Sequence, residues 1–301
     1  MEENQLAVAA QNKKQQIKAF NDIVNNAYYQ NQLKSLFGKN AGTFATSMME
    51  LYTSNADLQQ CDPKLVAAEA MKAAALHLPI QKSLGRAHVV VFKNKGIPTP
   101  TFIPGWKGLV DLAVRTGQYL TVNPTVVYEG ELRGVDKLSG FIDISGEKES
   151  NKVLGYVGYF ELIGGFKKMV YMTLKDMCHF AKTKAPSLKY NQKVTEQTLY
   201  DLAQKQAEEG PAADGMGWLA NFESMAKKTV IRRVLDYGPM SIEMQTAISL
   251  HDQAENAEAI RDAENLEARP VINASQMMQD AEEVKAEEVK DEPQTEDKPD
   301  F

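Results

Sequence analysis

The chain has 301 residues, of which 43% are hydrophobic and 25% are charged, so it is long enough to bury a sizeable hydrophobic core. No segment approaches the roughly 18 consecutive apolar residues of a membrane-spanning helix. The two cysteines, Cys61 and Cys178, lack the spacing of a disulfide framework. Composition therefore argues against a membrane protein or a disulfide-rich secreted protein, and it favours a cytoplasmic one.

The net charge of −6 conceals two regions of opposite sign. Residues 252–301 contain 16 acidic and 5 basic residues, a net of −11, which leaves 24 acidic and 29 basic residues, a net of +5, for residues 1–251. A basic body with an acidic end is typical of nucleic-acid-binding proteins that carry an interaction segment. An ordinary solvated surface gives the same pattern, so charge alone leaves both interpretations open.

Hydrophobic spacing predicts a helical N-terminal region. Residues 1–15 are polar and are expected to be flexible. Apolar residues then recur at helical spacing in residues 17–27, 44–52 and 63–76. Pro63 occupies the favoured first position of the last of these helices.

Residues 84–118 combine clear secondary-structure signals with positive charge. Extended segments at residues 87–92 and 99–103 flank a basic turn, which predicts a β-hairpin. A helix is predicted at residues 106–116, and Gly117 ends it. A hairpin with a basic turn, followed by a cationic helix, favours an anion-binding site.

Two residues of that helix bear on its role. Gly108 costs about 1 kcal/mol relative to alanine inside a helix. It lies beside Lys107, where a missing side chain would let a ligand approach the backbone. Trp106 falls on the apolar face, so packing in the core is favoured over stacking on a nucleic-acid base.

The rest of the body contains another hairpin and two basic helical stretches. Residues 120–128 predict a strand, and residues 153–173 predict a hairpin around two glycines. Residues 174–193 predict a helix that a proline breaks, with several lysines along it. A final helix is predicted at residues 218–237.

The final helix carries a basic cluster. Lys228 and Arg232 lie four residues apart and share a flank. Arg233 falls inside the predicted apolar stripe, where a snorkelling or acid-paired arginine is as compatible with the pattern as a phosphate contact.

Together these elements predict an α+β fold, in which a small antiparallel sheet of hairpins packs on helices. We expect a flexible N-terminus at residues 1–15, a folded domain at residues 16–250, and an acidic tail at residues 251–301. The tail is expected to be largely disordered because it is too polar to bury much apolar surface.

Several chemistries lack a sequence signature. No GxxxxGK[ST] phosphate loop is present, which argues against an ATP-driven strand-exchange protein. The four histidines are scattered without metal-ligand spacing, so no metal or other cofactor is expected. Two alternatives stay open: a metal-dependent nuclease that uses acidic residues near the strands, and a non-catalytic structural or chaperone protein.

Four segments carry a more specific signal: LGRAHVVVFKNK, FIPGWKGLVDLAVRTGQ, GYVGYFEL and WLANFESMAKKTVIRRVLDYGPMS. Their order and spacing, over roughly residues 60–245, resemble the blocks of the RecT family of prophage single-strand annealing proteins. The resemblance implies a recombinase that works without ATP. Such a protein coats single-stranded DNA left by a partner 5′-to-3′ exonuclease, anneals it to a complementary strand, and assembles as rings or helical filaments.

Annealing makes no covalent bond, so the protein need only neutralise phosphates and hold bases exposed. We therefore expect no catalytic residue, and we predict phosphate contacts from basic side chains with weaker stacking by two aromatic ones. The predicted DNA-binding residues are Arg86, Lys93, Lys95, Trp106, Lys107, Lys182, Lys184, Lys189, Tyr190, Lys228, Arg232 and Arg233.

The acidic end suggests two further roles. A tethered polyanion reaches an effective concentration of about millimolar, so it would compete with DNA for the basic body. Phe301 behind acidic residues also resembles the tail of bacterial single-stranded DNA-binding proteins, which suggests docking of partners such as the exonuclease or the host single-stranded DNA-binding protein. A solubilising segment without specific contacts is an equal alternative.

Overall fold

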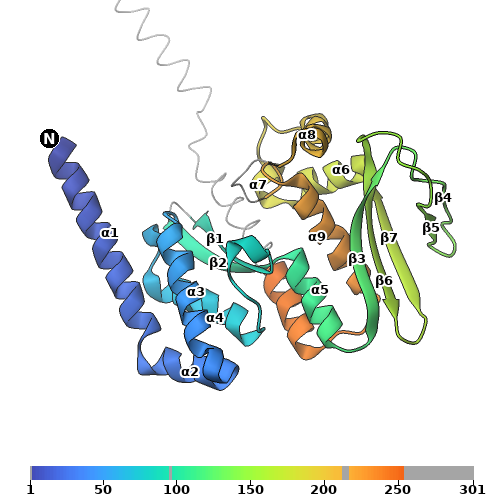
Figure 1. Cartoon of the computed structure of the whole chain (residues 1–301). Helices are drawn as coiled ribbons and strands as arrows, with labels where there is room; N and C mark the ends of the chain where they lie inside the picture. The colour runs from blue at the N-terminus through green and yellow to red at the C-terminus, as the bar shows by residue number, and fades with distance from the viewer. Residues whose placement is uncertain (1, 95–96, 212–216, 254–301) are drawn as a thin grey trace, which may run out of the picture. The chain divides into compact units, whose positions relative to one another are not determined.

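A computed structural model describes residues 2–94, 97–211 and 217–253, and within them the chain combines helices with small antiparallel sheets (Figure 1). The predicted α+β class is therefore confirmed. No helix in this part of the chain is long and apolar enough to cross a membrane. Lys95 and residues 254–301, which include most of the acidic tail, lie outside the described residues.

Four helices form the N-terminal region, and hydrophobic spacing predicts three of them. They are α1 (Glu2–Val24), α2 (Ala27–Phe37), α3 (Ala41–Ser54) and α4 (Pro63–Ala75). Helix α2 is the one without a predicted counterpart. Helix α1 begins at Glu2, so the segment expected to be flexible is helical instead. The Asp62 carboxylate accepts a hydrogen bond from the Lys64 amide at 2.9 Å and caps α4.

The first hairpin and the helix after it are confirmed. Strands β1 (Ala87–Asn94) and β2 (Ile97–Pro104) pair antiparallel and extend further toward the turn than expected. Helix α5 (Trp106–Arg115) follows at once. Gly117, in the left-handed region at φ +68°, ends the helix as predicted.

The second sheet is antiparallel with the strand order β3-β6-β7. Its strands are β3 (Tyr119–Tyr128), β6 (Val153–Leu162) and β7 (Lys167–Thr173), close to the predicted ranges. A short pair that was not predicted, β4 (Gly134–Val135) with β5 (Ile142–Asp143), lies in the connection between β3 and β6.

Helices complete the described part of the chain. They are α6 (Leu174–Lys184), α7 (Pro186–Lys189), α8 (Glu196–Glu209), α9 (Phe222–Leu235) and a helical segment at residues 242–253. The break between α6 and α7 falls at the predicted proline, whereas α8 has no predicted counterpart. Helix α9 is shorter than predicted because the Asn221 side chain caps its start by accepting from the Ser224 amide at 3.0 Å. Tyr237 lies beyond the end of α9 and is 60% exposed.

A glycine in the middle strand lets α9 lie close to the sheet. A Cβ atom on Gly158 of β6 would come within 2.5 Å of the carbonyl oxygen of Val230 in α9. Any larger residue would therefore push the helix away from the strand. This close contact fixes which face of α9 is covered by the sheet.

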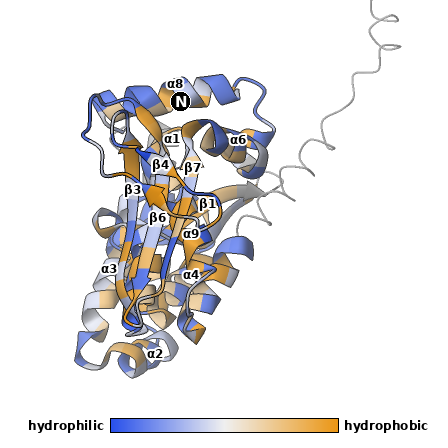
Figure 2. Ribbon diagram, turned by 90° about the vertical axis from the view of Figure 1, so that its right-hand side faces the viewer, coloured by the Kyte–Doolittle hydropathy of each residue, from blue (hydrophilic) through white to orange (hydrophobic). Residues whose placement is uncertain are grey.

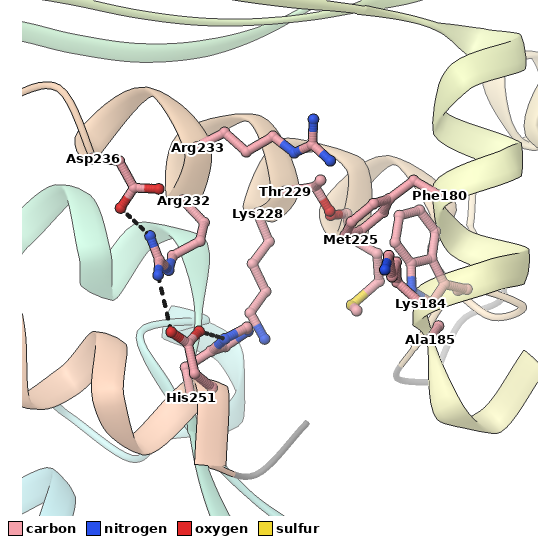
Figure 3. A pocket seen from close by; sticks show the side chains of 12 residues that line it. Phe180, Lys184, Ala185, Met225, Lys228, Thr229, Arg232, Arg233, Asp236 and His251 are labelled. Atoms are coloured by element: carbon pink, nitrogen blue, oxygen red, sulfur yellow. Dashed lines mark hydrogen bonds and ion pairs between the residues drawn. The ribbon is translucent and has the colours of Figure 1, made fainter. Parts of the chain in front are cut away.

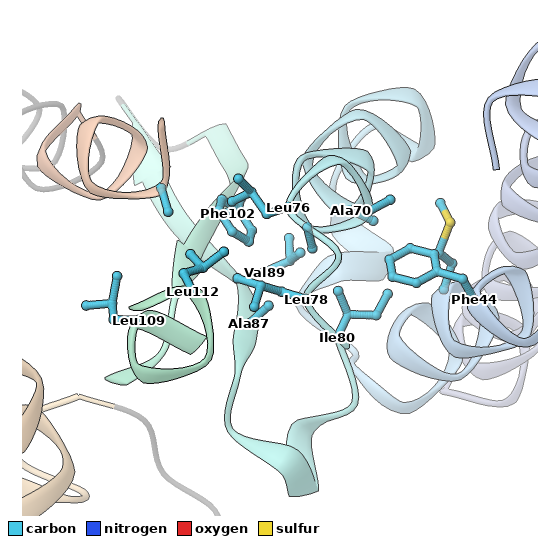
Figure 4. Close-up of a cluster of buried hydrophobic side chains, with 14 of the residues drawn as sticks. Phe44, Ala70, Leu76, Leu78, Ile80, Ala87, Val89, Phe102, Leu109 and Leu112 are labelled. Atoms are coloured by element: carbon cyan, nitrogen blue, oxygen red, sulfur yellow. The ribbon is translucent and has the colours of Figure 1, made fainter. Parts of the chain in front are cut away.

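Helix α9 joins two hydrophobic clusters. Ile231 and Val234 pack with the N-terminal helices, the first hairpin and α5, in the cluster that Figure 4 shows in part. Phe222 and Val230 pack instead with β6, α6 and α8. Because two faces of α9 are buried, polar side chains are confined to the positions between them.

Helix α8, by contrast, carries hydrophilic residues over much of its length (Figure 2).

Candidate nucleic-acid interface

A cavity of about 220 Å³ lies between α6, α9 and the helical segment at residues 242–253 (Figure 3). Aromatic side chains of Phe180 and Trp218 line one part of it, and the acidic residues Asp236 and Asp252 line another. Four basic residues, all predicted from sequence to bind DNA, also line this cavity: Lys184, Lys228, Arg232 and Arg233.

The basic side chains of α9 differ in exposure. Lys228 is buried, with 9% of its surface exposed, and extends toward His251 in Figure 3. Arg233 is exposed, and its guanidinium carbon lies 4.8 Å from the centroid of the Phe180 ring. The expectation that Arg233 falls inside the apolar stripe is therefore wrong. The stripe assumed one buried face, whereas α9 packs on two sides and Arg233 lies between them.

Arg232 is held by two carboxylates. Its Nη2 donates to Asp252 at 2.9 Å, and its Nη1 pairs with Asp236 one turn further along α9. Burial alone would lower the pKa of Arg232, but the hydrogen bonds and charges of Asp252 and Asp236 raise it above its ordinary value. The Nε atom is buried, and no hydrogen-bond partner for it is found among the described residues.

Two histidines near Lys228 add no positive charge to the cavity at neutral pH. Burial, together with the charges of Lys228 and Lys82, lowers the pKa of His88 to about 4. Burial and Lys228 also lower the pKa of His251, against the opposing effect of Asp252. With neutral imidazoles, the four basic and two acidic residues that line the cavity leave it a net charge of +2.

A second basic group lies where α5 approaches α9. The half-buried ring of Trp106 has the Lys107 ammonium 5.7 Å from its centroid and the Lys227 ammonium 5.9 Å from it. Lys227 also pairs with Glu223 at 2.6 Å. Lys227 was not among the predicted DNA-binding residues, because the sequence does not show that α5 packs beside this face of α9.

The structure corrects the interpretation of Gly108. A Cβ atom there would lie 2.2 Å from the carbonyl oxygen of Arg86, so the missing side chain lets α5 pack on the chain before β1 and leaves no opening for a ligand. The Gly105 amide donates to that same carbonyl at 2.9 Å. The Arg86 guanidinium forms an ion pair with Asp111 of α5.

The remaining predicted residues lie apart from the cavity. Lys182 donates to the carbonyl oxygens of Leu188 at 2.8 Å and Asn191 at 2.9 Å, so its ammonium stabilises the turn after α6. Lys189 is exposed, with its ammonium 5.2 Å from the centroid of the Tyr190 ring. The side chain of Lys93, like the whole of Lys95, lies outside the described residues.

The arrangement can bind anions beside an aromatic surface. Among the described residues, no group of three or more His, Cys, Asp or Glu side chains is placed to hold a metal ion. Fold and cavity together define an α+β protein with a basic, partly aromatic pocket between α6, α9 and the helical segment at residues 242–253.

Comparison with known proteins identifies the family. The family model described as the RecT family matches residues 42–268, which include every predicted DNA-binding residue. The chain is 38% identical over 224 residues to the uncharacterized protein YqaK of Bacillus subtilis (strain 168), covering 74% of this chain and 68% of that protein. It is 29% identical over 204 residues to Protein RecT of Escherichia coli (strain K12), covering 65% of each.

The chain therefore belongs to the RecT family. This membership confirms the resemblance noted in the sequence and supports a role in DNA recombination and strand annealing.

Proposed function

We propose that this protein binds single-stranded DNA and anneals complementary strands without ATP, acting in the cytoplasm as an oligomeric ring or helical filament. One observation carries the proposal. Basic residues from α6 and α9 gather at a single cavity beside two aromatic side chains, within the stretch that matches the RecT family. Such a combination suits a flexible polyanion whose bases can stack.

Annealing requires no catalytic side chain. Pairing of two strands breaks no covalent bond, so the protein must reduce phosphate repulsion and keep bases accessible. A cavity with a net charge of +2 reduces the repulsion between phosphates. Lysine and arginine predominate among the candidate contacts, and their contacts to phosphates carry no sequence information, so homology is read by base pairing alone.

Exposure divides the predicted contacts into two classes. Lys184 and Arg233 at the cavity, together with Lys107 and Lys189, are exposed and can reach a phosphate directly. Lys182 already bonds two carbonyl oxygens and supports the interface from behind.

Membership in the RecT family also implies partners for this activity. A 5′-to-3′ exonuclease of the phage would supply the single strand, and the host single-stranded DNA-binding protein would meet the same substrate. The acidic residues after Gln253 would contact these partners or compete with DNA. Removing residues 254–301 and measuring DNA and partner binding tests both roles, and no change in either would show a purely solubilising segment.

Mixing two complementary labelled oligonucleotides with the protein, once with EDTA and once without it, and always without ATP, tests the function. Fluorescence energy transfer that develops faster than spontaneous pairing supports annealing. Strand loss that EDTA abolishes would indicate a metal-dependent nuclease instead. Neither pairing nor loss would indicate a structural or chaperone protein.

A further inference from the structure

The contact between Arg232 and Asp252 joins α9 to a different part of the chain. Asp252 belongs to the helical segment at residues 242–253, and its Oδ2 lies 2.9 Å from Nη2 of Arg232. Asp236, the other partner of Arg232, is the residue that follows the end of α9. The guanidinium at the cavity is thus covered by a carboxylate that arrives from the C-terminal side.

The helical segment that carries Asp252 is packed in the core at its start and partly exposed at its end. Met244 and Ala247 are fully buried in the core cluster, and Ile248 is nearly so. The Asp252 side chain, in contrast, is 46% exposed at the edge of the cavity. If Asp252 turns away from Arg232 into solvent, it also gives up its Oδ1 contact with Nδ1 of His251 at 3.3 Å, while Met244, Ala247 and Ile248 stay packed in the core.

A carboxylate and a phosphate compete for the same N–H groups. Both bind a guanidinium through charge-assisted hydrogen bonds, so Nη2 of Arg232 cannot serve Asp252 and a DNA phosphate in the same geometry. The side chains of the pair are 21% exposed at Arg232 and 46% exposed at Asp252, so salt screens the pair in part and a polyanion can displace the carboxylate.

We infer that Asp252 is an internal competitor of DNA, which occupies Arg232 when no DNA is bound and must leave before Arg232 contacts a phosphate. The inference rests on the proposed function and adds a regulation of the same site. Asp252 also begins the stretch of residues 252–301, whose net charge is −11. The competitor is thus the first acid of a longer anionic run.

The full-length variant Asp252→Asn tests this inference, because it removes the charge and keeps the shape. Fluorescence anisotropy with a labelled single-stranded oligonucleotide should show about two- to five-fold tighter binding at low salt. The slope of log affinity against log salt should stay close to that of the unmodified chain, because Arg232 contacts the same phosphate in both complexes once Asp252 has left. Thermal unfolding checks that the variant is folded.

Asp22→Asn is the matched control. Asp22 is an exposed residue of α1, away from the cavity lining, so the control makes the same charge change elsewhere. If both variants tighten binding equally, the effect is one of net charge and the inference fails. A gain confined to Asp252→Asn, and lost when Arg232→Gln is added, supports competition at Arg232.

The two proposals fail in different ways. If the unmodified chain binds no single-stranded DNA, both the function and the competition are wrong. If it binds and anneals, but Asp252→Asn does not tighten binding beyond the control, only the competition is wrong.

Discussion

The ammonium of Lys227 lies 5.9 Å from the centroid of the Trp106 ring, so a cation of α9 covers an aromatic side chain at the start of α5. Lys228, the next residue, is buried in the cavity beside His251. Adjacent lysines therefore face two different basic groups, and the sequence alone singled out only the buried one.

Replacing Lys227 should weaken DNA binding if the Trp106 group is part of the interface. In Lys227→Ala the slope of log affinity against log salt should become shallower by about 0.7, since one phosphate contact is lost. Lys205→Ala is the control, because Lys205 pairs with Glu209 of α8 in the same four-residue spacing as Lys227 with Glu223. An equal slope in both variants would show that Lys227 is not part of the interface.

Substitutions at Lys228 and Arg233 should differ in their effect on the melting temperature. Arg233 is exposed, so Arg233→Ala should reduce DNA affinity with little change in melting temperature. Lys228 is buried, so Lys228→Ala should lower the melting temperature as well, by the few degrees that about 1 kcal/mol represents. Thermal unfolding and anisotropy measure the two effects, and an unchanged melting temperature in Lys228→Ala would contradict its buried placement.

Acid should destabilise the fold through His88. Its pKa is about 4 in the folded protein and about 6.5 when unfolded. The unfolded state therefore binds more protons between these values, and stability present above about pH 6.5 is lost as the pH falls toward 4. Urea unfolding at pH 7.5 and pH 5 measures this loss, and His88→Gln should reduce it. The same pH dependence in the variant would show that other groups cause it.

Alanine at two helical glycines should have opposite effects. In Gly108→Ala the new Cβ meets the Arg86 carbonyl at 2.2 Å, so the variant should lose about 1–3 kcal/mol of stability. Gly42 in α3 has nothing within 4 Å of its Cβ position, so Gly42→Ala should gain about 0.5–1 kcal/mol from helix propensity. Chemical denaturation distinguishes them, and a stable Gly108→Ala would argue against the close approach of α5.

The local elements follow from local chemistry. Alternating β-branched residues and turn glycines predict both hairpins, and Gly117 predicts the end of α5, because these signals act over a few neighbouring residues. The four RecT-like segments likewise predict the family, which the comparisons confirm. Helix α8 was not predicted because its apolar positions are few within a polar stretch.

The tertiary structure alone decided which charges meet. Helix α9 packs against the sheet on one side and against α5 on another. This packing decides that Arg233 is exposed, that Lys228 is buried and that Lys227 lies near the Trp106 ring. A one-residue step turns a helix by about 100°. Sequence periodicity places residues on a helix, but only the neighbours of that helix determine which of its faces remains open to a ligand.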